Sequence, residues 1–74
     1  MNIQELKKYK IKSIRTKSGM VVLGKPAEVI DEGNLFRIAD MYVVDKGNIA
    51  SVEKKNNTIH VEYANGDTYD LGIC

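Results

Sequence analysis

A chain of 74 residues holds one small domain, so we take residues 1–74 as a single domain. Cys74 is the only cysteine and His60 the only histidine, which excludes an internal disulfide and a zinc site of the Cys/His type. Eleven basic and ten acidic side chains give a net charge of +1, yet seven of the basic ones lie in the first 25 residues beside one acid.

The chain opens with a predicted short helix. Asn2 is a suitable N-cap, and Glu5 stands three residues later, where its side chain can reach back to the cap amide. Ile3 and Leu6 share one face of this helix, which is expected to run to about Tyr9. A helix of this length persists only when it packs against the rest of the domain.

The apolar spacing after Tyr9 is typical of strands. It predicts a hairpin with strands near 10–16 and 20–24 around the turn Lys17-Ser18-Gly19. Pro26 has no amide hydrogen, so we expect it at a sheet edge or a strand boundary. Shorter strands are predicted over 27–30, 35–38 and 41–44, with turns at 31–34 and 45–48.

The last third of the chain predicts a three-stranded meander. Its strands are expected over 49–53, 58–63 and 68–71. Asn65-Gly66 predicts a type I′ turn, in which both residues have positive φ. Alternation gives one apolar face, which carries Ile59, Val61, Tyr63, Tyr69, Leu71 and Ile73, and a polar face with His60, Glu62, Thr68 and Asp70.

These elements predict a mainly β fold: a small antiparallel, strongly bent sheet, or an SH3/Sm-like barrel, with a short N-terminal helix. A domain this small buries about 60% of the surface of its unfolded chain, and it has neither a disulfide nor a metal to reinforce it. Self-association is the remaining reinforcement, so we expect a homo-oligomer.

Residues 13–34 resemble the first motif of Sm-like proteins. Gly19, Gly24, Asp31 and Asn34 match its turn glycine, its second glycine and its turn Asp and Asn, and residues 46–49 resemble the Arg-Gly turn of the second motif. The resemblance implies an oligomeric ring that binds RNA near these turns. A proline at 26 and a further hairpin over 54–73 depart from the Sm layout, which leaves a generic SH3-type barrel as the alternative.

No catalytic constellation is recognisable in the sequence. A triad needs a nucleophile, a base and an orienting group, and His60 lies on the polar face of a strand beside Glu62. Glycine-rich phosphate loops are also missing. We therefore predict a protein that is not an enzyme, with no catalytic residue, no metal ligand and no cofactor.

The basic residues favour a binding site for phosphate. Lys10 and Lys12 project from one side of the first predicted strand, and Arg15 and Lys17 follow. They form a basic ridge beside the turn at Ser18, whose backbone amides can also meet an anion. The alternative is a solvated strand edge, since lysines commonly protect edges from aggregation.

Three further residues are candidates for the same site. Arg37 can bind phosphate in a bidentate manner, and Tyr42 and Tyr63 offer rings on which a base can stack. The alternative for this segment is an internal pair of Arg37 with Asp40 and a Tyr42 ring packed against the core.

The sequence therefore predicts a cytoplasmic, non-enzymatic binding module without a membrane partner. Its expected ligand bears phosphate, as a nucleotide or a single-stranded nucleic acid, and is bound by a homo-oligomer. The alternative function is that of a phage-type accessory protein that inhibits a host protein or sequesters a host defence signal.

Overall fold

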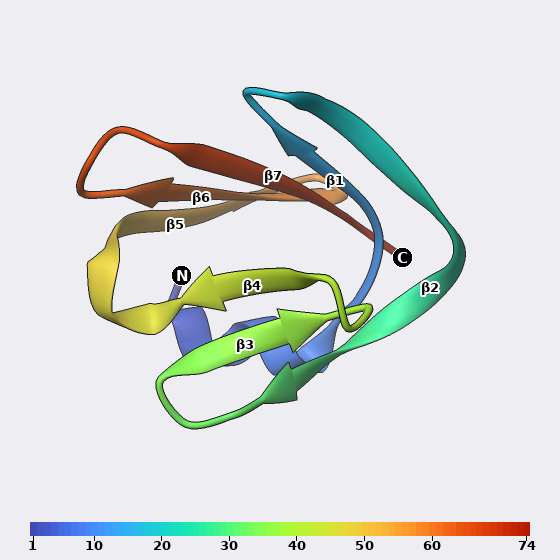
Figure 1. Ribbon diagram of the computed structural model, residues 1–74, viewed down its shortest axis with the longest axis horizontal. Helices are drawn as coiled ribbons and strands as arrows, with labels where there is room; N and C mark the ends of the chain where they lie inside the picture. Colours follow the sequence, from blue (N-terminus) through green and yellow to red (C-terminus); the bar gives the residue numbers. More distant parts are fainter.

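The computed structural model describes residues 1–74 and consists mainly of strands (Figure 1). The elements are the 3-10 helix η1 (Ile3–Lys8), strands β1 (Lys10–Thr16), β2 (Gly19–Asp31), β3 (Leu35–Ile38) and β4 (Tyr42–Asp45), the 3-10 turn η2 (Lys46–Asn48), and strands β5 (Ile49–Lys55), β6 (Thr58–Tyr63) and β7 (Thr68–Ile73). All neighbours are antiparallel, in the order β4-β3-β2-β1-β7-β6-β5. The predicted mainly β fold with a short N-terminal helix is confirmed. The sheet is strongly bent but does not close into a barrel, because its two end strands, β4 and β5, do not pair.

The predicted cap of η1 is confirmed. The Asn2 side chain accepts a hydrogen bond from the Gln4 amide at 2.8 Å, and the Asn2 amide donates to Glu5 Oε2 at 3.0 Å. The second bond lowers the pKa of Glu5 because it stabilises the carboxylate. Leu6 is fully buried, so the helix is anchored in the concave side of the sheet by this side chain.

Pro26 lies inside a strand and not at a strand boundary, which corrects the prediction of separate strands over 20–24 and 27–30. The alternative position at a sheet edge is met, since this part of the strand has no second neighbour before Val29. The single strand β2 runs through it (Figure 1). Ile11 pairs with Ala27 and Ser13 with Val22, so residues 23–26 bulge opposite Lys12 alone. A proline is tolerated in such a bulge because no ladder hydrogen bond needs its missing amide hydrogen. Beyond the bulge, β2 pairs with β1 again through Ala27 and Glu28, and from Val29 to Asp31 it pairs with β3.

The Asn65-Gly66 turn is not of type I′, because only Gly66 has positive φ (+94°). The Gly66 amide donates to the Tyr63 carbonyl at 3.0 Å, and the Asn65 side chain accepts from the Asp67 amide at 2.9 Å. That local contact holds Asn65 outside the left-handed region. Two successive residues with positive φ occur instead in the β3–β4 turn, at Ala39 (55°) and Asp40 (59°). Strand β4 therefore begins after this turn, at Tyr42, and not at residue 41 as predicted.

One apolar core fills the concave side of the curled sheet. The predicted meander and its apolar face are confirmed by the burial of alternate residues on β6 and β7. The buried apolar residues are Leu6, Ile11, Ile14, Val29, Phe36, Ile38, Val44, Val52, Ile59, Val61, Leu71 and Ile73. They come from η1 and all seven strands, so no element is dispensable for the core.

Asp31 joins the end of β2 to two other elements. Its carboxylate accepts from Lys46 Nζ at 2.7 Å and from the Gly33 amide at 2.9 Å, and Lys7 Nζ lies 3.5 Å away. The Lys46 and Gly33 hydrogen bonds lower the pKa of Asp31 from 3.8 to about 2. The ionised form of Asp31 therefore stabilises the folded state.

We expect Asp31→Asn to lower the melting temperature at pH 7 and to lose its effect near pH 2. The folded pKa lies below the unfolded one, so the stabilisation is present above pH 3.8 and disappears as the pH falls towards about 2. Thermal unfolding followed by circular dichroism from pH 2 to 7 tests this. Glu28→Gln, at an exposed carboxylate without an ion pair, is the control. Equal effects of the two variants at every pH would contradict the role of Asp31.

Candidate functional site

The unpaired cations of the protein gather on β1. Six of the eleven lysine and arginine side chains form ion pairs: Lys7, Lys8, Lys17, Arg37, Lys46 and Lys55. The remaining five have no carboxylate within 4.0 Å, and three of them, Lys10, Lys12 and Arg15, lie exposed on β1. These three residues are called the basic strip. The register of β1 shifts between Ile11 and Ser13, so Ile11 and Ile14 both point into the core and the three cations lie on the outer side.

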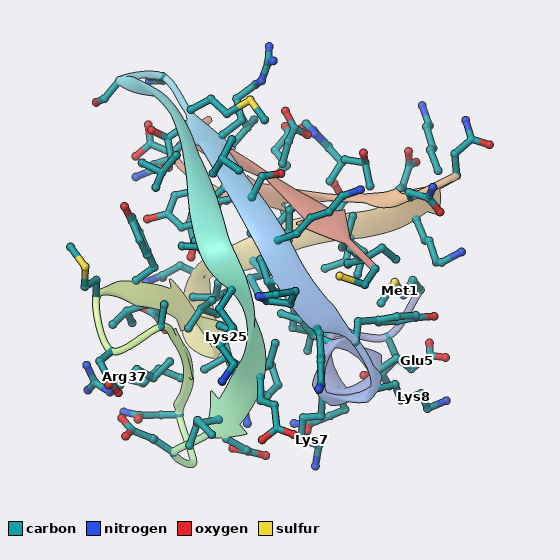
Figure 2. The ribbon with its side chains drawn as sticks, turned by 90° about the vertical axis from the view of Figure 1, so that its right-hand side faces the viewer. Met1, Glu5, Lys7, Lys8, Lys25 and Arg37 are labelled. Atoms are coloured by element: carbon teal, nitrogen blue, oxygen red, sulfur yellow. The ribbon has the colours of Figure 1, made fainter.

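Lys25 lies close to the basic strip. It belongs to the bulged part of β2, residues 23–26, which faces Lys12 in the β1–β2 register. Figure 2 shows Lys25 at the bend of β2, away from Lys7 and Lys8 on η1. Its ammonium group has no carboxylate partner within 4.0 Å, so Lys25 adds a fourth free cation to this part of the surface.

A shallow depression of about 270 Å³ lies on the same outer face. It is lined by Ser13, Arg15, Met20, Thr58, Asp70 and Gly72. The register places Met20, Arg15, Asp70, His60 and Glu53 opposite one another on five neighbouring strands. His60 Nδ1 lies 2.5 Å from Asp70 Oδ1. Asp70 is thus bonded to His60 and not to Arg15. The Arg15 guanidinium donates only to Met20 Sδ, at 3.5 Å, so no carboxylate competes with an external anion for it.

The turn residues predicted for the basic ridge are engaged elsewhere. Lys17 Nζ lies 2.8 Å from Asp67 Oδ1, and this contact lowers the pKa of Asp67. The Ser18 amide donates to the Thr16 hydroxyl at 3.2 Å, so it does not point freely at a ligand. Neither residue extends the basic strip in this arrangement.

Arg37 forms a pair, but with Glu32 rather than Asp40. Its guanidinium donates through Nε and Nη2 at 2.9 to 3.1 Å. The pair raises the pKa of Arg37 and lowers that of Glu32, since each charge stabilises the other. Arg37 lies on β3, outside the basic strip (Figure 2).

Tyr42 and Tyr63 lie on the concave side of the sheet. Tyr42 is opposite the buried Ile38 and, with Ile14 and Val21, lines a shallow hollow. The Tyr63 hydroxyl accepts from the Asp45 amide at 3.1 Å, and its ring meets that of Tyr69 edge-on at 5.6 Å. Burial raises the pKa of Tyr63. The predicted stacking residues are therefore separated from the basic strip by the sheet itself.

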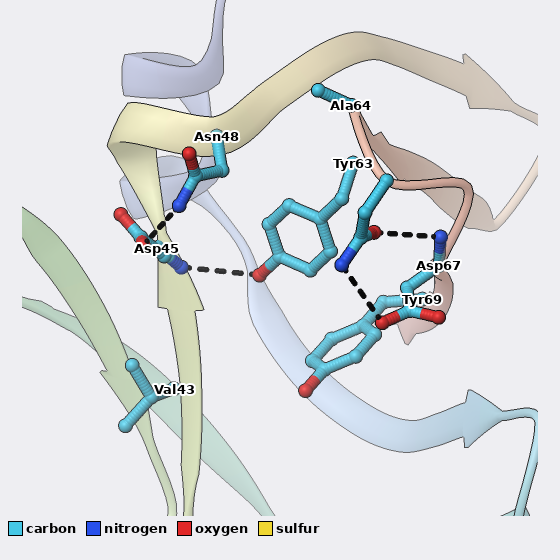
Figure 3. A pocket seen from close by; sticks show the side chains of 8 residues that line it. Val43, Asp45, Asn48, Tyr63, Ala64, Asp67 and Tyr69 are labelled. Carbon is cyan, nitrogen blue, oxygen red and sulfur yellow. Dashed lines mark hydrogen bonds between the residues drawn. The ribbon is translucent and has the colours of Figure 1, made fainter.

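Tyr63 and Tyr69 line the mouth of the curled sheet, an open pocket of about 490 Å³ (Figure 3). The other lining residues are Val43, Asp45, Asn48, Ala64, Asn65 and Asp67. Two carboxylates face this pocket, and the nearby Lys17 is already bonded to Asp67. The mouth is poorly suited to phosphate, because its local charge is negative.

No three His, Cys, Asp or Glu side chains gather into a group that could hold a metal ion. No helix has the length and apolar character needed to cross a bilayer. Comparison of the chain with protein-family models, curated proteins and solved structures found no match. The arrangement of its own side chains is therefore the basis for a functional proposal.

Proposed function

We propose that the protein is a non-enzymatic binding module whose homo-oligomer binds the phosphates of a single-stranded nucleic acid along the basic strip. The observation that carries this proposal is that Lys10, Lys12 and Arg15 stand together on one strand without a carboxylate partner, while most other cations are neutralised. Unpaired cations attract anions without first having to break an internal ion pair.

The surroundings of the basic strip favour a polymer over a mononucleotide. Tyr42 and Tyr63 lie on the opposite side of the sheet, so neither of these rings can stack on a base bound at the strip. At about 3.3 Å per residue, Lys10 and Arg15 are about 17 Å apart along β1. A row of that length matches several successive phosphates better than one nucleotide.

Binding to a labelled single-stranded oligonucleotide should weaken steeply with salt. Each neutralised phosphate contributes about −0.7 to the slope of log affinity against log salt, so three contacts give a slope of about −2. Replacing Lys10, Lys12 and Arg15 together with Ser should weaken binding at low salt and bring the slope close to zero. Fluorescence anisotropy over a salt series measures both quantities.

The matched control removes three cations elsewhere, as Lys8→Ser, Lys17→Ser and Lys55→Ser. These side chains are exposed and already ion-paired, so their loss changes the net charge equally but leaves the basic strip intact. We expect this control to retain the wild-type slope. Equal weakening by both triple variants, or no binding of any oligonucleotide at low salt, would overturn the proposal.

A protein partner is the second candidate function. Met20 and Val22 are exposed on the same outer face as Arg15, and apolar side chains beside a cation suit a protein surface better than a phosphate backbone. An accessory protein that inhibits a host protein, or sequesters a defence signal, would use such a face. A pull-down that captures a partner with wild type, but not with Met20→Ser/Val22→Ser, supports this candidate if oligonucleotides fail to bind.

A further inference from the structure

The first half of β2 is an open sheet edge with exposed apolar side chains. β2 pairs with β3 only through residues 29–31, so the segment before the bulge has β1 on one side and no strand on the other (Figure 2). The exposed fractions are 51% for Met20, 42% for Val21 and 71% for Val22. Unpaired backbone groups and apolar side chains together form a surface ready to add a strand.

The other two edges are protected in ways that the β2 edge is not. β5 ends in Lys54 and Lys55, and such charges discourage pairing with another chain. β4 has four residues, and its Asp45 amide already donates to the Tyr63 hydroxyl. Residues 18–24 of the β2 edge contain no charge, and Pro26 lies beyond them. This uncharged edge is complementary to the same edge of a second copy of the chain, which is also uncharged.

Hydrogen-bond directions select the register of such pairing. β1 and β2 are joined by the two-residue turn 17–18, so Thr16 and Gly19 form a hydrogen-bonded pair. Alternation then directs the backbone N–H and C=O of Met20 and Val22 away from β1, towards the open edge. An antiparallel pair of two identical edges centred on Val22 brings these outward groups face to face.

The edge residues before the bulge agree with this register. Gly19 to Val22 carry no charge, so no like charges oppose one another when two copies pair there. A shift of the centre to Val21 would direct the Val21 backbone groups towards β1 instead of the partner. The hydrogen-bond direction therefore selects Val22 as the centre.

We propose that two copies of the chain pair antiparallel through β2, with Val22 facing Val22 across a two-fold axis. This inference deepens the proposed self-association and does not rest on the nucleic-acid ligand. The two β1 strands of the dimer are three strand spacings apart, or about 14 Å. Both basic strips then lie on one continuous outer face, so the second copy completes a broader cationic surface.

Cysteine cross-linking tests the register directly. In a Cys74→Ser background, Val22→Cys should form an intermolecular disulfide rapidly, since facing residues of a hydrogen-bonded pair have Cα atoms about 5.5 Å apart. The control Met20→Cys should not, because its Cα lies about 14 Å from its counterpart in this register. Equal cross-linking by both variants would overturn the register.

Sedimentation tests the interface independently. Wild type should be a dimer at micromolar concentration, and Val22→Lys should raise the dimer dissociation constant about 100-fold or more through like-charge repulsion at the axis. Met41→Lys, at an equally exposed side chain in the β3–β4 turn, should leave the dimer intact. Thermal unfolding of each variant confirms that the fold survives. A monomeric wild type at high concentration would overturn the proposal.

The triple variant of the basic strip separates the two proposals. Replacing Lys10, Lys12 and Arg15 with Ser leaves the β2 edge unchanged, so that variant should still sediment as a dimer while it loses the oligonucleotide. A monomeric wild type that binds the oligonucleotide would overturn the dimer alone. A dimer that binds no oligonucleotide would overturn the ligand alone.

Discussion

Leu6→Ala is expected to lower the free energy of unfolding by about 2–5 kcal/mol, the usual cost of truncating a fully buried leucine. Leu6 is completely buried and is the one fully buried side chain of η1. A domain of this length has a total stability of about 4–11 kcal/mol. The variant would therefore lose a large part of its stability, which urea unfolding followed by circular dichroism can measure.

The control for this prediction is Ile3→Ala on the same helix. Ile3 is partly exposed and packs at the margin of the core, so its truncation should cost clearly less than that of Leu6. Equal costs for the two variants would mean that η1 has no specific anchor. A Leu6→Ala protein as stable as wild type would contradict the packing of η1 against the sheet.

Gly72→Ala should destabilise the domain by about 1–3 kcal/mol, as overpacking of a tight contact does. A Cβ atom at position 72 would stand 2.2 Å from Ser13 Oγ, closer than any real contact. Gly72 has no positive φ, so the close approach of β1 and β7 is the reason for glycine here. Thermal or urea unfolding measures the loss.

Ser13→Ala should rescue Gly72→Ala. Without Oγ, the nearest neighbours of the added Cβ are Ser13 Cβ at 3.4 Å and Lys12 Cγ at 3.5 Å, both ordinary contact distances. A double-mutant cycle of the two substitutions should therefore show a favourable coupling. Strict additivity would mean that the Ser13 hydroxyl is not the obstacle.

Local rules predicted most strands and turns correctly, but they missed that one strand runs through Pro26, and they gave the wrong type for the Asn65-Gly66 turn. Proline is excluded from a regular ladder, and the sequence does not show that residues 23–26 bulge away from it. A two-residue turn at Asn65-Gly66 would place His60 opposite Leu71. The longer turn observed places His60 opposite Asp70 and creates their contact.

Of the eight predicted site residues, the structure groups Lys10, Lys12 and Arg15 on the outer face of β1. Lys17 and Arg37 are bonded to Asp67 and Glu32, and Tyr42 and Tyr63 lie on the concave side. Strand alternation was sufficient to place Lys10 and Lys12 together. The unguarded apolar edge over 20–23 was missed, because a run of Met, Val and Leu predicts a strand equally well at an edge or in the centre of a sheet.

The sequence by itself determined the capped first turn, the hairpins and the apolar faces, because these depend on residues a few positions apart. The tertiary structure alone decided which cations are free. Asp31 contacts Lys7 on η1 and Lys46 on η2, and Asp67 contacts Lys17 in another turn, so each pair joins segments well separated in the chain. The order, register and curl of the sheet decide which charged side chains come close together. These distances cannot be predicted from composition or local sequence.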